Sequence, residues 1–155
     1  MSSAIGVSVL DPSLYIPELK LRRRDSALHQ MVSRAHGAGA VREPALLLET
    51  LALRERRVSA ALGKGVAIPQ ARSIAVIEPR LVVARSKRGI DWSAPDRALV
   101  HLILLVLAPA ELPEEAHHEF IARAAGVALL QRNRQKLLAA EGFEAVAAVL
   151  REVTP

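Results

Sequence analysis

The feature that most restricts the fold of this chain is a near-continuous aliphatic run over residues 99–107. A run of strand length without polar alternation is typical of a central strand that is covered on both faces. His101 lies early in this run, and we interpret it as a hydrogen-bonded strand histidine. Pro109 and Pro113 mark the exit of the chain from the strand. The run therefore predicts a sheet with a layer of helices on each side.

Helical patterns lie on both sides of this run in the sequence. In each of them, apolar residues recur three or four positions apart. Asp25 is interpreted as the N-cap of the first helix, and Pro44 fits the first turn of the second. The predicted helices, in chain order, cover residues 25–37, 43–57, 114–130, 133–139 and 143–153.

Short strands are predicted between these helices. Residues 14–21 are expected to form an edge strand, because Pro17 lacks the N–H group that an interior strand needs. Residues 66–68 and 77–84 read as two more strands, and Arg88-Gly89 is interpreted as a turn. Strands that alternate with helices indicate an α/β fold.

We therefore expect one α/β domain with a mixed sheet of four or five strands, flanked by helices on both faces. It is assigned to residues 14–155, after a loose lead-in over residues 1–13. A chain of 155 residues is long enough to bury a core without disulfides. Its lack of cysteine excludes disulfides in any case, together with thiol catalysis and zinc fingers.

Composition also narrows the possible partners. The apolar runs are too short to cross a bilayer, which needs about 20 residues, and the N-terminus lacks the pattern of a signal peptide. We expect a cytoplasmic protein with no membrane span, no metal and no cofactor. The formal net charge is +5, but only Lys20 and residues 22–24 form a tight basic cluster. Without interleaved aromatic residues, this charge does not favour nucleic-acid binding.

Three stretches carry a more specific signal. Residues 53–72 read Leu-Arg-Glu-Arg-Arg-Val-Ser-Ala-Ala-Leu-Gly-Lys-Gly-Val-Ala-Ile-Pro-Gln-Ala-Arg, and residues 88–96 read Arg-Gly-Ile-Asp-Trp-Ser-Ala-Pro-Asp. Residues 100–109 form an apolar strand that ends in Ala-Pro, and His117-His118 follow near the start of the next helix. Together they resemble the IIA component of the phosphoenolpyruvate-dependent sugar phosphotransfer system, of the fructose, mannitol and nitrogen-regulatory type (EIIA type 2).

The resemblance implies transfer of a phosphoryl group from a small phosphocarrier protein to a histidine, and Gln70 stands at the position of that histidine. An imidazole nitrogen can attack phosphorus. A carboxamide nitrogen is a poor nucleophile, because its lone pair is delocalised into the carbonyl group. Gln70 can donate and accept hydrogen bonds, but we do not expect it to carry phosphate. No catalytic residue is therefore expected.

The same resemblance implies a vestigial pocket around this position. Arg54 matches a family arginine close to the active site, and Ser59 matches the serine that begins a glycine-rich loop. His117 matches the second family histidine, and its neighbour His118 is kept as an alternative. The implied pocket residues are Arg54, Ser59, Gly63, Gly65, Gln70, His117 and His118.

Other positions depart from the family pattern. Ala60 and Ala61 stand where the family prefers threonine and glycine. Arg97 replaces the glycine that follows Asp96, which leaves the conformation of that turn open. These departures suggest a pocket that has moved away from phosphate handling.

Two hypotheses for the function follow. In the first, the chain is a regulatory or binding module that has lost the phosphoacceptor and docks onto a phosphocarrier protein, a transporter or a kinase. In the second, it is an active phosphohistidine carrier in sugar or nitrogen-related phosphotransfer that uses another histidine, such as His117.

Overall fold

A single mixed sheet runs through the computed structural model, which describes residues 9–155. Within these residues the sheet has six strands, at least one more than expected, in the order β2-β6-β7-β4-β3, with β5 also paired to β7. In chain order they are β2 Tyr15–Ile16, β3 Ala61–Gly63, β4 Val66–Ala67, β5 Gln70–Ser73, β6 Arg80–Ile90 and β7 Val100–Pro109.

Strand β7 is the centre of this sheet. It pairs antiparallel with β6 along one edge and parallel with β4 and β5 along the other. Residues 102–109 are all buried, which confirms the prediction of a central strand covered on both faces. The Nδ1 atom of His101 lies 2.8 Å from the carbonyl oxygen of Ser86, so the prediction of a hydrogen-bonded strand histidine is also confirmed.

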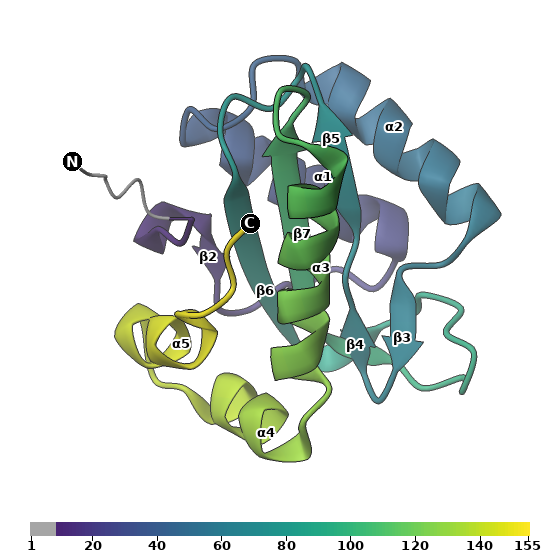
Figure 1. Ribbon diagram of the computed structural model, residues 1–155. Helices are drawn as coiled ribbons and strands as arrows, with labels where there is room; N and C mark the ends of the chain where they lie inside the picture. Colours follow the sequence, from purple (N-terminus) through teal and green to yellow (C-terminus); the bar gives the residue numbers. More distant parts are fainter. Residues whose placement is uncertain (1–8) are drawn as a thin grey trace.

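Helices cover both faces of the sheet. Figure 1 shows α3 across one face, with α4 and α5 beside it near the C-terminus, and α1 behind the opposite face. The α/β fold, with a mixed sheet between two helical layers, is therefore confirmed. A short 3-10 helix, η1 (Pro12–Leu14), precedes β2. The α-helices are α1 Arg24–Gly37, α2 Pro44–Arg57, α3 Glu114–Ala128, α4 Gln131–Ala139 and α5 Phe143–Leu150.

Each face of the sheet has its own aliphatic core. The core under α1 and α2 includes Met31 and Leu47, neither of which has any exposed surface. The core under α3, α4 and α5 includes Phe120, Leu137 and Leu150. Each fully buried side chain of this size contributes about 1.5–3 kcal/mol of transfer free energy. None of the described helices is both long and apolar enough to cross a membrane.

Some predicted details differ in the structure. Asp25 is not the N-cap of α1: Arg23 occupies that position, and Asp25 lies in the first turn, where the helix dipole favours an acid. Arg88-Gly89 is not a turn but lies inside β6, where the register with β7 shifts and Gly89 has φ +94°. The edge strand predicted at residues 14–21 exists at the sheet edge, but only as the short β2.

The predicted lead-in is described only in part, since residues 1–8 lie outside the described residues. Beyond them, the carbonyl oxygen of Val9 accepts a hydrogen bond from the backbone N–H of Leu81 at 3.0 Å. The side chain of Asp11 caps η1 by accepting from the backbone N–H of Ser13 at 2.9 Å. The domain boundary at residue 14 stays a prediction.

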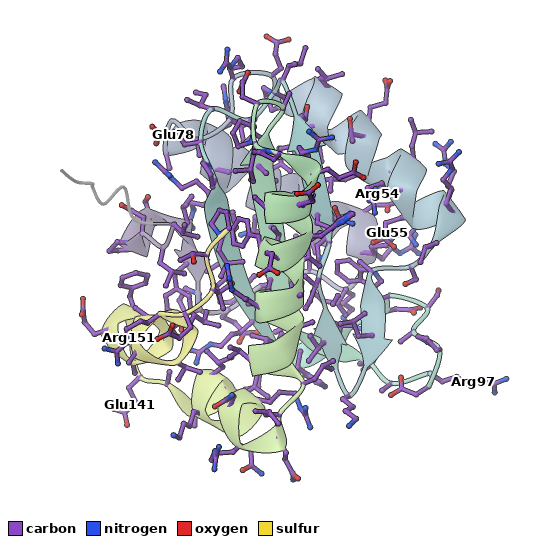
Figure 2. The ribbon with its side chains drawn as sticks, viewed as in Figure 1. Arg54, Glu55, Glu78, Arg97, Glu141 and Arg151 are labelled. Atoms are coloured by element: carbon purple, nitrogen blue, oxygen red, sulfur yellow. The ribbon has the colours of Figure 1, made fainter. Side chains whose placement is uncertain are left out.

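The turn after Asp96 keeps a left-handed residue. Arg97 has φ +62°, the region that glycine adopts without strain. The carboxylate of Asp96 accepts from the backbone N–H groups of Lys64 (2.9 Å) and Ala98 (3.1 Å), and these bonds, the Lys64 bond first, lower the pKa of Asp96. Arg97 itself points away from the molecule (Figure 2). Arg97 thus holds a backbone conformation that glycine would adopt without strain.

Replacing Arg97 with glycine should relieve this strain. A left-handed conformation costs a residue with a Cβ atom about 1–2 kcal/mol, part of which is offset by the greater freedom of glycine in the unfolded chain. We expect Arg97→Gly to raise the free energy of unfolding in urea by about 0.5–1 kcal/mol. Arg97→Ala removes the same charge but keeps Cβ, so it should give no such gain. An equal gain in both variants would assign the effect to charge instead.

Candidate functional site

A cleft of about 240 Å³ opens between the C-terminal end of α2, the start of β5 and the middle of α3. Most of its lining is apolar, including Val58, Leu62, Ile68 and Ile121. Its polar lining consists of Arg54, Glu55, Ser59 and Gln70. Figure 2 shows Arg54 and Glu55 between α2 and α3.

Gln70 lies at the start of β5 and joins two other side chains. Its amide group lies 2.9 Å from Nε2 of His117. With the NH₂ group toward His117, the amide oxygen accepts from Nε of Arg54 at 3.3 Å and also from Nη2. The opposite orientation would place the NH₂ group against the guanidinium, donor against donor. The amide of Gln70 therefore accepts from Arg54 and donates to His117.

His117 is a buried, neutral imidazole. Only 4% of the residue is exposed, and Nε2 must carry a lone pair in order to accept from Gln70. The proton then sits on Nδ1, a buried atom for which the described residues provide no hydrogen-bond partner. Burial, and to a smaller extent the nearby charge of Arg72, lower the pKa of His117 from 6.5 to about 4. Geometry and electrostatics agree that this ring is uncharged at neutral pH.

Glu55 was missed by the sequence reasoning as a site residue. Its side chain is 4% exposed and accepts from the backbone N–H of Ala60 at 3.1 Å and from Nε1 of Trp92 at 3.2 Å. Burial raises the pKa of Glu55, although the hydrogen bonds from Ala60 and Trp92 oppose this. The carboxylate thereby ties the end of α2 to the loop that forms one wall of the cleft. The Arg-Glu pair of the first motif was the signal available for it.

The structure brings together some of the predicted pocket residues and separates others. Ser59 lines the cleft with Arg54 and Gln70, and its hydroxyl accepts from the backbone N–H of Ala61 at 3.1 Å. His117 lies directly behind Gln70. The remaining predicted residues, Gly63, Gly65 and His118, lie elsewhere.

The two glycines belong to the β3–β4 hairpin, beside rather than inside the cleft. Gly63 (φ +88°) faces the carboxylate of Asp96, and Gly65 (φ +77°) approaches the backbone of Leu99. Both use left-handed conformations that allow the tight turn. His118 points outward from α3: its side chain is 68% exposed and lies 3.9 Å from Glu114.

Comparison with known proteins gives the family. The sequence model of the protein family EIIA 2, of the phosphoenolpyruvate-dependent sugar phosphotransferase system, matches residues 8–153. The chain belongs to this family. The resemblance on the three motif stretches is thus confirmed at the level of the family.

Relatives within the family differ in length. The chain is 27% identical over 134 residues to the PTS system fructose-specific EIIABC component of Bacillus subtilis. The aligned residues make up 86% of this chain but 21% of that protein. It is 31% identical over 139 residues to the nitrogen regulatory protein of Bradyrhizobium diazoefficiens, which covers 90% of both. The chain therefore spans about a fifth of one relative and nearly all of the other.

Solved structures share the fold. Nitrogen regulatory protein IIA-Ntr from Neisseria meningitidis is 27% identical, with a TM-score of 0.82 over 92% of this chain and 96% of that one. Enzyme IIA mannitol from Escherichia coli, in its complex with phosphorylated enzyme IIB mannitol, has a TM-score of 0.75 over 92% of this chain and 96% of that one. At 17% identity, the second likeness concerns the fold alone.

The low pKa of His117 predicts a pH dependence of stability. Below about pH 6.5 the unfolded chain gains a proton on this residue, whereas the folded protein gains it only near pH 4. The His117 contribution to the free energy of unfolding should therefore be complete above pH 6.5 and fall by about 3 kcal/mol as the pH drops to 4. Urea unfolding of the wild type and of His117→Gln, at several pH values, measures this difference. Parallel pH profiles for the two proteins would contradict it.

Proposed function

We propose that this protein is a regulatory or docking module of the phosphotransferase system that does not carry phosphate. The observation that supports the proposal is the side chain at position 70. The family resemblance puts the phosphorylated histidine there, and the chain has Gln70. Its amide has no nucleophilic lone pair for phosphorus, because the nitrogen lone pair is delocalised. A pseudoenzyme, which keeps the family fold but does not accept phosphate, fits this replacement best.

The surroundings of His117 argue against a displaced phosphoacceptor. Its Nε2 is occupied by the amide of Gln70, and its Nδ1 is buried. Phosphoryl transfer needs a nucleophile in line with the leaving group, and an error of about 1 Å can cost a hundredfold in rate. A donor could reach this ring only if Gln70 and α3 moved. The alternative of a carrier that uses His117 therefore has less support.

The proposed role is to bind a protein partner through the face around Gln70. The candidates are a phosphocarrier protein, a transporter component or a kinase. The solved complex of Escherichia coli IIA mannitol with phosphorylated IIB mannitol supports a protein-docking role for the same fold in this chain. The nitrogen regulatory relatives place regulation among the roles to be tested.

A phosphotransfer assay tests the proposal. Incubation with radiolabelled phosphoenolpyruvate, enzyme I and the phosphocarrier protein should leave the wild-type chain unlabelled, because Gln70 cannot accept the phosphoryl group. Gln70→His should become labelled, since Arg54 and His117 already flank that position. Gln70→Asn is the matched control and should stay unlabelled.

One outcome would argue against the proposal, and another would narrow its explanation. Label on the wild type would overturn it, and loss of that label in His117→Gln would establish the alternative carrier. An unlabelled Gln70→His, with the wild type also unlabelled, would mean that the neighbours of position 70 no longer support phosphate either.

A further inference from the structure

The C-terminal end of α2 presents positive charge to solvent. Arg54, Arg56 and Arg57 are all exposed and lie in the last turn of the helix. The ion pairs of the described residues leave all three without a carboxylate partner. The one acid in this turn, Glu55, is turned inward toward Ala60 and Trp92. We call the three arginines the basic rim.

Apolar side chains lie directly beside the basic rim. Val58 follows it in the sequence and is 76% exposed, and Leu62 is 44% exposed. Both line the cleft, together with Ile68 and Ile121. Single exposed apolar residues are common, but here they continue into a cleft with an apolar lining. The result is an apolar depression that Arg54 lines directly, while Arg56 and Arg57 lie in the same turn of α2 outside its lining.

The other sides of the cleft do not neutralise this charge. The segment of α3 that faces it, residues 121–128, contains one ionisable residue, Arg123, which pairs with Glu119 at 2.9 Å. On the hairpin side, the carboxylate of Asp96 accepts from the backbone N–H of Lys64, and the formal positive charge of the Lys64 side chain offsets that of the carboxylate. The mouth of the cleft is therefore positive on the α2 side and close to neutral on the α3 side.

A simpler explanation covers only part of this pattern. Cations in the last turn of a helix interact favourably with its dipole, which accounts for the arginines. It does not account for Val58 and Leu62, whose exposure gives the isolated chain no stability. An interface explains both features, because apolar anchors provide affinity and complementary charges select the partner.

We propose that this cleft binds an acidic protein segment that inserts one large apolar side chain beside Val58 and Leu62. Carboxylates on either side of the anchor would pair with the basic rim, since the guanidinium fork suits carboxylates. The inference rests on the proposed docking function and specifies the chemistry of its partner. Charges at the rim of an interface act mainly on the rate of association, and salt screens their effect.

Peptide titration followed by amide NMR spectra of the full chain tests this. Three blocked peptides of nine residues serve as probes: a central phenylalanine flanked by glutamates, the same phenylalanine flanked by lysines, and a central alanine flanked by glutamates. We expect the first to shift the signals of residues 58–62 and 121–125, and to bind at least about fivefold more tightly than the other two. Raising the salt should weaken this binding.

Charge-reversal variants provide the matched comparison. Arg56→Glu/Arg57→Glu should weaken binding of the glutamate–phenylalanine peptide at least about fivefold, and both substitutions leave Arg54 and Gln70 unchanged. Arg132→Glu/Lys136→Glu makes the same change in charge on the exposed surface of α4, which lies away from α2 (Figure 1). This control should bind within about twofold of the wild type.

Several results would overturn the inference: equal binding of the lysine-flanked peptide, equal weakening in the α4 control, shifts outside the cleft, or no shifts at millimolar peptide. The peptide assay involves no phosphoryl transfer. Label on the wild-type chain in the phosphotransfer assay would therefore refute the proposed function without altering the measured charge preference. If the peptide test fails and the wild type is unlabelled, the proposed function stands and only the proposed chemistry of its partner is refuted.

Discussion

The parallel pairing of β5 with the buried strand β7 decides where the side chain of Gln70 lies. Successive residues of a strand point to opposite faces, and Ala71 packs into the core under α1 and α2. Gln70 is thereby directed to the other face, where α3 carries His117. A slip of one residue would reverse this arrangement. The register is secured by the pairs from Gln70↔Val106 to Ser73↔Pro109.

Once it is placed there, the amide of Gln70 can serve two different neighbours. A carboxamide is both donor and acceptor, so it satisfies the guanidinium of Arg54 and the neutral ring of His117 at the same time. A carboxylate at this position could not donate to His117, and an aliphatic side chain would leave Nε2 of the buried His117 unpaired, at a cost of about 1–3 kcal/mol. The buried histidine therefore stays uncharged beside the cation of Arg54.

Much of the fold could be predicted from the sequence, because its long elements have strong periodicity. The five helices and the central strand are where the apolar pattern puts them. The short strands β3 and β5 were missed: Gln70–Ser73 has no alternation of polar and apolar residues, and its strand conformation depends on pairing with β7. Gly89 was misread for a similar reason, because tertiary packing holds it inside β6.

Only the site residues that belong to the family motif could be predicted from the sequence. The resemblance implied that Arg54, Gln70 and His117 share a pocket, and the structure places them in one hydrogen-bonded network. The buried role of Glu55 could not be inferred from a charged residue in an arginine-rich turn, since such residues are usually exposed. The position of Gly63 and Gly65 beside the cleft depends on the hairpin and on Asp96, which only the folded chain brings together.

The central claim, that Gln70 donates to a neutral His117, can be tested through the tautomer of this ring. A two-bond ¹⁵N–¹H correlation spectrum of the wild type at neutral pH distinguishes protonated from unprotonated imidazole nitrogens. We expect a proton on Nδ1 of His117 and an unprotonated Nε2 that accepts a hydrogen bond from the Gln70 amide. A proton on Nε2, alone or together with one on Nδ1, would contradict it.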